Sequence, residues 1–129
     1  MQILQPPEWA RPRGYACGIA AQGRLVFISG QIGWDEQSRF RSTDFVAQSR
    51  QALQNVLTVL AEADGRPEHI VRLTWYIVDK QEYLACNKNL GMAYRELMGK
   101  HYPTMTVVQV TALVEDLARV EIEATAVVP

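Results

Sequence analysis

The stretch Arg119-Val120-Glu121-Ile122-Glu123-Ala124-Thr125-Ala126-Val127-Val128 places an apolar residue at every second position. Because the side chains of a β-strand point to opposite faces in turn, this period predicts a strand over residues 119–128. One predicted face is entirely apolar and carries Val120, Ile122, Ala124, Ala126 and Val128. The other face carries Arg119, Glu121, Glu123, Thr125 and Val127, which sets carboxylates in the middle of the strand.

The segments that precede this strand predict further strands and two helices. Residues 70–78 and 105–112 are rich in β-branched and aromatic residues, which favours strands, and two short runs on either side of Gln22-Gly23 predict a hairpin. Apolar residues at helical spacing predict helices over 44–63 and from Asp79 to about Met98. Gly65 and Gly99 stand where the ends of these helices favour glycine. The proline-rich residues 1–13 predict an irregular arm.

The predicted order, β-β-α-β-α-β-β, is an α+β layout in a single domain, with two helices packed on one face of a mixed sheet. The other face of that sheet is not polar enough to lie in water. On the strand at 105–112, for example, neither set of alternating side chains forms a solvated surface. Two helices cover only one face, so we expect a second subunit to cover the other and the protein to be an oligomer.

The composition resembles that of an ordinary globular protein, with 48% hydrophobic and 21% charged residues among 129. A net charge of −1 creates no long-range field, so we expect neither nucleic acid nor a membrane as a partner. Residues 1–7 lack the pattern of a signal peptide, and no apolar run approaches the ~18–20 residues of a bilayer span. We therefore expect a cytoplasmic protein in which Cys17 and Cys86 are free thiols.

The common signatures of catalysis and cofactor binding are missing from the sequence. It contains no Walker loop, no dinucleotide-binding G-x-G-x-x-G after a strand, no H-E-x-x-H and no G-x-S-x-G. Two histidines and two distant cysteines do not make a zinc site. We expect no metal and no cofactor, and we interpret His69 and His101 as a loop residue and a helix-end residue.

The remaining candidates for a functional site are Tyr15, Ser29, Gln31, Tyr83, Asn87 and Glu121. Each of them also has an ordinary structural explanation, such as a core tyrosine with a bonded hydroxyl or an exposed helical asparagine. Glu121 is the hardest to explain in that way, because it lies in mid-strand between apolar neighbours. A buried carboxylate needs either a partner or a function.

Four segments taken together, in order and with similar spacing, resemble the RidA/YjgF family: residues 25–31, 71–79, 102–103 and 120–126. The resemblance covers nearly the whole chain after the N-terminal arm. It implies a chorismate-mutase-like α+β fold and a homotrimer that binds small molecules in clefts between subunits. It also implies an activity without a cofactor, the hydrolysis of reactive enamines or imines such as 2-aminoacrylate to a keto acid and ammonia.

The resemblance also implies roles for particular residues. The cleft tyrosine of the family corresponds to Tyr15, and the serine of its S-G-Q turn corresponds to Ser29. The aromatic residue early in its second helix corresponds to Tyr83, and the asparagine four residues later to Asn87. The glutamate of its last strand corresponds to Glu121. We expect Glu121 and Ser29 to be catalytic and the other three to bind substrate.

One position departs from the family pattern. The deaminating members carry an arginine two residues after a proline, where it binds the carboxylate of the substrate, and this chain has Pro103-Thr104-Met105. Because a methionine offers neither charge nor donor, Met105 would line the cleft as an apolar group. Two alternatives stay open. One is an enzyme with a more apolar substrate, or with a carboxylate held by Arg24, Arg72 or Arg119; the other is a trimeric protein that binds a small ligand without chemistry.

Overall fold

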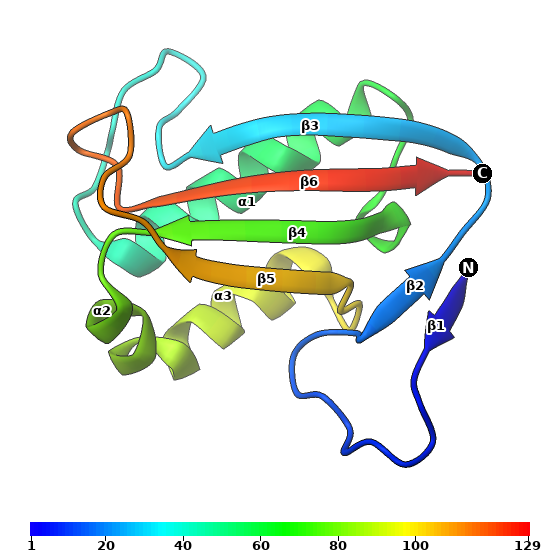
Figure 1. Ribbon diagram of the computed structural model, residues 1–129. Coiled ribbons are helices and arrows are strands. Elements are labelled where there is room, and N and C mark those ends of the chain that lie inside the picture. Colours follow the sequence, from blue (N-terminus) through cyan, green and yellow to red (C-terminus); the bar gives the residue numbers. More distant parts are fainter.

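A computed structural model describes residues 1–129 as a four-stranded sheet with helices on one face and a two-stranded sheet beside it (Figure 1). The elements are β1 (Gln2–Leu4), β2 (Gly18–Ala20), β3 (Arg24–Ile32), α1 (Phe45–Ala61), a short 3-10 helix η1 (Pro67–His69), β4 (Ile70–Ile77), α2 (Lys80–Ala85), α3 (Asn87–Met98), β5 (Thr104–Gln109) and β6 (Val120–Val128). The α+β architecture and the mixed sheet predicted from the sequence are confirmed.

The larger sheet has the strand order β3-β6-β4-β5. Strand β6 runs antiparallel to both β3 and β4, whereas β4 and β5 are parallel. The strand with the most regular alternation thus lies inside the sheet. Its apolar face is confirmed as core, since each of its five apolar residues is at most 5% exposed: Val120, Ile122, Ala124, Ala126 and Val128.

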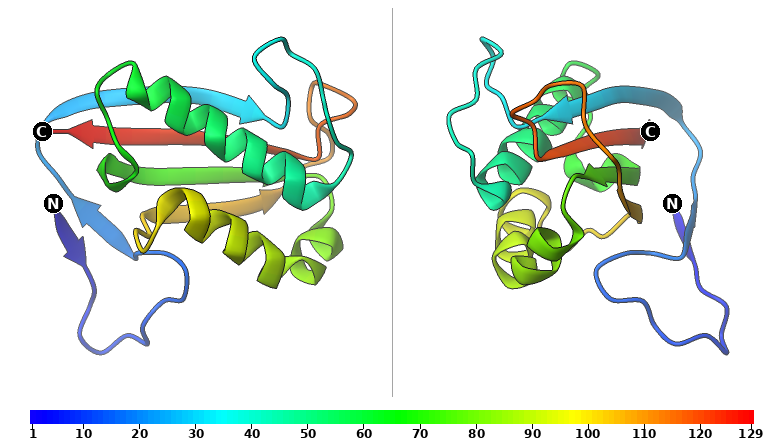
Figure 2. Two further views of the ribbon diagram at one scale, coloured as in Figure 1. Left: turned by 180° about the vertical axis from the view of Figure 1, so that it is seen from behind. Right: turned by 60° about the vertical axis from the view of Figure 1, so that its left-hand side comes forward.

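Helices α1 and α3 cover one face of this sheet, and the second view in Figure 2 places all of the helices on that side. Asp44 caps α1, because its Oδ2 accepts a hydrogen bond of 2.9 Å from Ala47 N. The helix predicted from Asp79 to Met98 is in fact two helices, α2 and α3, which meet at Cys86. No helix of the chain is long and apolar enough to cross a membrane.

The two glycines predicted at helix ends have different roles. Gly99 ends α3 with φ at 65°, a conformation that glycine adopts without strain. After α1, the residue with positive φ is Asp64, at 57°, and not Gly65. Gly65 instead lies against Leu60, where a β-carbon would overlap the leucine side chain.

The hairpin predicted on either side of Gln22-Gly23 is wrong. Strand β2 pairs with β1, and β3 pairs with β6, so the chain turns at Gly23 from one sheet into the other. The prediction of an irregular arm over residues 1–13 also needs correction, because Gln2–Leu4 form β1. The β-prone Ile3 and Leu4 precede the prolines, and the arm folds back far enough to pair with β2.

Candidate functional site

Ser29 and Glu121 lie together at one end of the sheet, on the face that the helices leave open. Glu121 alternates with the buried Val120 and Ile122, so its side chain points away from the helices. Both residues line a pocket of about 370 Å³, which is completed by Gly30, Gln31, Ile32, Trp34, Val114 and Glu115. The two residues predicted to be catalytic therefore share one cavity.

Gly30 allows the carboxylate of Glu121 to lie close against β3. A β-carbon at position 30 would overlap Oε2 of Glu121, so a larger residue there would displace the carboxylate. Gln31 is bound within the same irregular part of β3, because its Nε2 donates to the Ser29 carbonyl at 3.1 Å and to Ser29 Oγ at 3.3 Å. The Ser29 hydroxyl keeps its own proton for donation to a ligand.

Two glutamates of β6 share the open face but have different surroundings. The hydroxyl of Tyr76 donates to Oε1 of Glu123 at 2.5 Å. This hydrogen bond is the main cause that raises the pKa of Tyr76 above its usual value; desolvation and the charges of Glu123 and Glu121 add to it. Glu121 takes part in no salt bridge. Glu123 therefore has a hydrogen-bond partner within the chain, whereas Glu121 forms no ion pair.

The loop that follows β3 brings Trp34 to the same pocket and is organised by Asp35. Oδ1 of Asp35 accepts hydrogen bonds from the backbone N–H groups of Gln37 and Arg39 at 2.9 and 3.1 Å, and Oδ2 accepts from Nε of Arg41 at 2.7 Å. The bond from Arg41 is the main reason that the pKa of Asp35 lies below its usual value. One carboxylate therefore fixes the shape of the loop.

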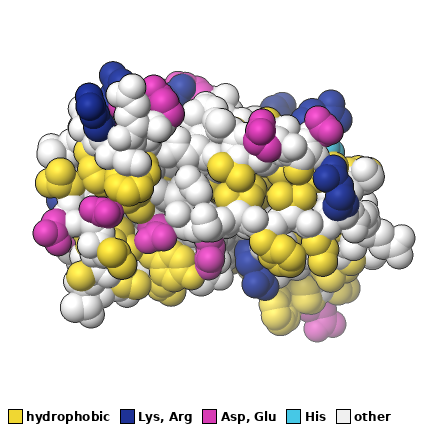
Figure 3. Space-filling model, turned by 90° about the horizontal axis from the view of Figure 1, so that it is seen from above, with side chains coloured by type: hydrophobic (Ala, Val, Ile, Leu, Met, Phe, Trp, Pro, Cys, Tyr) yellow, Lys and Arg dark blue, Asp and Glu magenta, His cyan; other side chains and the backbone are white.

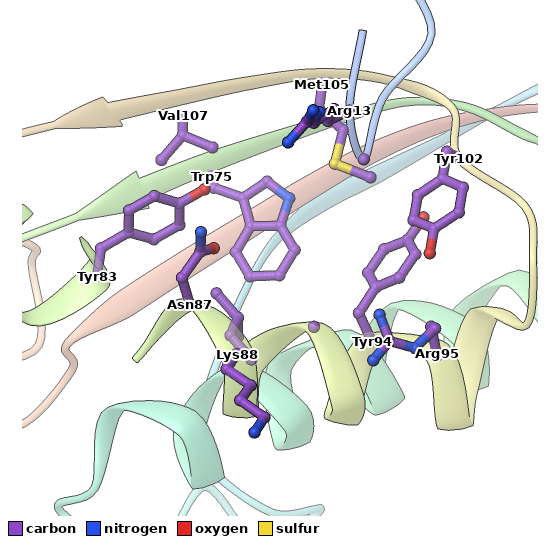
Figure 4. A pocket seen from close by; sticks show the side chains of 13 residues that line it. Arg13, Trp75, Tyr83, Asn87, Lys88, Tyr94, Arg95, Tyr102, Met105 and Val107 are labelled. Atoms are coloured by element: carbon purple, nitrogen blue, oxygen red, sulfur yellow. The ribbon is translucent and has the colours of Figure 1, made fainter. Parts of the chain in front are cut away.

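Tyr83, Asn87 and Met105 line a second pocket, of about 590 Å³, between the β4–β5 edge of the sheet and helices α2 and α3. Figure 4 shows Tyr83 and Asn87 at one end of it, with Met105 and Val107 projecting from β5. Met105 points toward the helices because it pairs in register with Leu73, which is fully buried in the core. The break at Cys86 separates the helix that carries Tyr83 from the helix that carries Asn87.

Tyr15 lies in a third pocket, of about 610 Å³, on the open side of the sheet. The segment that carries it runs beside β5, because Ala16 forms a parallel bridge with Thr104 and its N–H donates to the Pro103 carbonyl at 3.0 Å. Met105, on this edge strand, borders both the second and the third pocket. It is the one predicted residue that connects two cavities.

One copy of the chain does not bring the predicted residues into a single site. Glu121 points to the open face, whereas Met105 points to the helix-covered face, and β4 separates the strands that carry them. Ser29 lies on β3, at the opposite edge of the sheet from β5. The chain thus holds one group around Ser29 and Glu121 and a separate group around Tyr83, Asn87 and Met105.

Sequence reasoning did not identify several residues of the second pocket, among them Arg13, Trp75, Tyr94, Arg95 and Tyr102. The ring of Tyr94 stacks on that of Tyr102 with centroids 5.3 Å apart. Nε1 of Trp75 is buried without a hydrogen-bond partner, which costs roughly 1–3 kcal/mol. Gly91, a glycine inside a helix, was one signal in the sequence, and it also lines this pocket.

Of the arginines considered as replacements for a carboxylate-binding residue, two are bound to other groups of the chain and the third lines a pocket with Tyr15 and Met105. Arg24 Nη2 donates to the Ala63 carbonyl at 2.7 Å, and Arg119 Nε contacts both carboxylate oxygens of Glu82, at 2.8 and 2.9 Å. Arg72 lines the third pocket, with Tyr15. No group of three or more His, Cys, Asp or Glu side chains lies close enough to hold a metal ion.

Both histidines contact backbone groups. Nδ1 of His69 accepts a hydrogen bond from Arg66 N at 2.9 Å, and Nε2 of His101 lies 2.7 Å from the Ile70 carbonyl oxygen. His101 follows the end of α3 as interpreted from the sequence, whereas His69 is the last residue of the short 3-10 helix η1 and does not lie in a loop.

Comparison with known proteins gives relatives over nearly the whole chain. The family model described as endoribonuclease L-PSP matches residues 10–128. A protein of Escherichia coli K12 named as the reactive intermediate deaminase TdcF is 33% identical over 108 residues, which cover 81% of this chain and 80% of TdcF.

Solved structures of related proteins superpose closely on this chain. A member of the conserved Rid protein family from Yersinia pestis, of unknown function, has a TM-score of 0.84 at 28% identity, with 98% of each chain covered. The crystal structure of Escherichia coli TdcF with bound serine has a TM-score of 0.72 at 29% identity, and each chain is covered completely. From the fold, the matched residues and these relatives together, the chain belongs to the RidA/YjgF family, whose family model carries the description endoribonuclease L-PSP.

Proposed function

We propose that the protein hydrolyses a reactive imine or enamine to a carbonyl compound and ammonia, in a site assembled between copies of the chain. The observation that carries this proposal is the separation of the residues of the site. Glu121 and Ser29 lie on one face of the sheet, and Tyr83, Asn87 and Met105 lie on the other, at the far edge. In an oligomer, a neighbouring copy can place its second group of residues beside the first group of this copy. The relative named as a reactive intermediate deaminase, TdcF, supports the reaction class.

The open face of the sheet suits such an assembly. Its exposed hydrophobic side chains include Leu25 and Phe27, at 61% and 74% exposure, and Val108. Figure 3, seen from above Figure 1 and so onto the β3 edge of the sheet, shows hydrophobic side chains in two groups, with acidic side chains in the group at the end where β3 and β5 lead into their loops. A monomer leaves this apolar surface in water, whereas a ring of copies buries it. We propose a homotrimer.

The residues around Glu121 can perform the hydrolysis without a cofactor. An enamine first takes up a proton at carbon and loses one from nitrogen, and so becomes an imine. The carboxylate of Glu121 then takes a proton from a water molecule while the water oxygen attacks the imine carbon, and this proton passes on to the imine nitrogen. When the resulting carbinolamine collapses, its hydroxyl proton passes by way of the Glu121 carboxylate to the amine, the C–N bond breaks, and ammonia leaves as the carbonyl forms. Ser29 holds the attacking water or the product oxygen through its hydroxyl.

Met105 shifts the choice of substrate away from 2-aminoacrylate. A methionine at the position of the carboxylate-binding arginine removes a charged hydrogen bond, worth roughly 2–5 kcal/mol in a desolvated site. At the same place it offers a flexible apolar contact. We propose that the substrate is larger and more apolar than 2-aminoacrylate.

We also propose a cytoplasmic location. Cys17 is exposed and Cys86 is half-buried, and neither forms a disulfide. Free thiols of this kind persist in a reducing compartment.

The test is the release of ammonia and keto acid from imines generated in situ, with wild type beside Glu121→Gln and Met105→Arg. We expect Glu121→Gln to lower kcat by about 10²–10⁴, the usual contribution of a general acid–base group. We expect Met105→Arg to raise turnover of 2-aminoacrylate at the expense of apolar imines. If all three proteins are silent on every imine while their oligomeric state is intact, the proposed activity is wrong.

A further inference from the structure

Glu121 has very different neighbours on its two sides. On the β3 side lies Gly30, where a β-carbon would overlap Oε2, Cδ and Cγ of Glu121, so the whole carboxyl group lies over a residue without a side chain. On the β4 side, Tyr76 is the residue directly opposite Glu121 in the antiparallel register. Residues paired in this way have β-carbons about 4.5–5.5 Å apart. The carboxylate thus has open space on one side and a large ring on the other.

The ring of Tyr76 is fixed at both ends. Its neighbours Trp75 and Ile77 are buried in the core, so Tyr76 points to the open face, as Glu121 does. Its hydroxyl donates to Oε1 of Glu123, the next residue along β6 on the same face, at 2.5 Å. Because the backbone of Tyr76 pairs with Glu121 and its hydroxyl reaches Glu123, the ring lies along β6 beside the space between the two glutamates.

The phenol keeps its proton and therefore stays a donor. The hydrogen bond to Glu123 is the main cause that raises the pKa of Tyr76, and the charge of Glu121 is a smaller cause of the same sign. Both carboxylates thus lie near the phenol. At neutral pH the hydroxyl remains bound to Glu123, so the ring is held in the conditions under which hydrolysis would be measured.

This arrangement limits where the Glu121 carboxylate can lie. A carboxylate that turned toward β4 would meet the ring of Tyr76. Over Gly30 it meets no side chain, and there it lines the same pocket as Ser29. A missing side chain on β3 and a fixed ring on β4 therefore favour the same orientation.

We propose that Tyr76 is a positioning residue for Glu121, and that Glu123 acts through Tyr76. The ring, held by the hydrogen bond to Glu123, keeps the Glu121 carboxylate over Gly30 and toward Ser29. Neither Tyr76 nor Glu123 lines the pocket that Ser29 and Glu121 share, so both act through Glu121 and not on the substrate. The effect on hydrolysis rests on the proposed function, whereas the orientation of Glu121 does not.

The experiment compares wild type with variants of this pair. Tyr76→Phe keeps the ring and removes only the hydroxyl. Glu123→Ala removes the acceptor, and Glu123→Gln keeps an acceptor oxygen without the charge. A double variant combines Tyr76→Phe with Glu123→Ala. The control is Arg50→Gln, which breaks the surface ion pair between Arg50 on α1 and Glu96 on α3, on the helix side of the molecule.

The first readout is the steady-state kinetics of imine hydrolysis. We expect Tyr76→Phe and Glu123→Ala each to lower kcat about 10–100-fold, because a small misplacement of a reacting group has an effect of up to this size. KM should change little, since neither side chain lines the pocket. The double variant should be no slower than the slower single variant, because the two residues act as one unit. Glu123→Gln should retain most of the kcat, and Arg50→Gln should match wild type.

The second readout needs no turnover. Crystal structures of wild type, Tyr76→Phe and Glu123→Gln show where the Glu121 carboxylate lies. In Tyr76→Phe it should leave Gly30 or occupy more than one rotamer, and in Glu123→Gln it should stay over Gly30. Circular dichroism gives the Tm of each protein and checks that it is folded.

A Glu121 carboxylate that stays over Gly30 in Tyr76→Phe overturns the inference. So does a lower Tm with unchanged kcat, which would identify the hydrogen bond as purely structural, and so does an equal loss of kcat in Arg50→Gln. If wild type hydrolyses no imine, the proposed function fails and the crystal structures alone decide the orientation. If wild type is active but Glu121 does not move in Tyr76→Phe, the proposed function stands and this inference fails.

Discussion

The two faces of the central sheet are formed by the same alternating strands, but one face is buried under helices and the other is exposed. On the helix-covered face, Val120, Ile122 and Leu73 have no exposed surface. On the open face, Phe27 is 74% exposed and Leu25 is 61% exposed. The chain therefore buries one apolar face with its own helices, and the other face is left for another molecule to cover. A strand pattern indicates that a face is apolar, but it does not indicate which molecule covers it.

Polar groups differ between the two faces in the same way. Behind the sheet, the buried Gln48 has its amide fully engaged, since Nε2 donates to the carbonyls of Ser42 and Leu117 and Oε1 accepts from Arg119 N. On the open face, Glu121 lines a pocket and takes part in no salt bridge. The amide of Gln48 thus helps to hold the fold together, whereas the carboxylate of Glu121 lines a cavity without an ion-pair partner.

The largest expected effect on stability comes from a substitution in the helix-covered face of the sheet. Ile122→Ala should lower the free energy of unfolding by about 2–5 kcal/mol, because it removes a fully buried side chain from the central strand and leaves a cavity. Urea unfolding followed by circular dichroism measures the change. A loss below about 0.5 kcal/mol, the range of ordinary surface substitutions, would contradict the assignment of this face as the core.

The next effect concerns the open face. Phe27→Asp should leave the fold of a single chain intact, since Phe27 is exposed, but should convert the proposed trimer into monomers by placing a charge in the apolar contact. Native mass spectrometry measures the mass, and circular dichroism checks the fold. Imine hydrolysis should be lost with the trimer, because the pockets of Glu121 and Asn87 separate.

The matched control is Val59→Asp, at an exposed position on α1, on the other side of the molecule. It introduces the same charge and should leave the mass unchanged. A Phe27→Asp protein that stays trimeric would show that the open face is not the interface. Dissociation of both variants would show a general loss of stability.

Much of the fold could be predicted because its core strands carry strong local patterns. The alternation in residues 119–128 identified both the central strand and its buried face, and the β-branched run at 70–78 identified β4. The prediction for the N-terminal region was wrong for a physical reason. Two strands joined by a short turn usually pair, but β3 gains more by pairing with β6, next to the core, and leaves β2 to β1.

The sequence supplied a set of candidate site residues but not their arrangement in space. Resemblance to a family supplied Ser29, Glu121, Tyr83 and Asn87, and nothing in their spacing showed that they occupy two separate pockets of one chain. Arg13 and Trp75 were missed because an arginine in a proline-rich arm and a tryptophan in a buried strand both have ordinary explanations. Only the three-dimensional arrangement shows that they share a cavity.

The smallest expected effect lies in the loop that runs from the open-face pocket to α1. The pKa of Asp35 is lowered in the folded protein, mainly by its hydrogen bond from Arg41, so Asp35 stabilises the fold above the unfolded pKa of about 3.9. As the pH falls through the lower folded pKa, protonation removes that contribution. The effect is small, because the Arg41 side chain is 73% exposed and the pair is screened by water. Wild type should therefore have a higher Tm than Asp35→Asn at pH 7, and the difference should shrink once the pH drops below about 4. A difference that persists unchanged at pH 2 would mean that the backbone hydrogen bonds of residue 35, and not its charge, hold Trp34 beside Glu121.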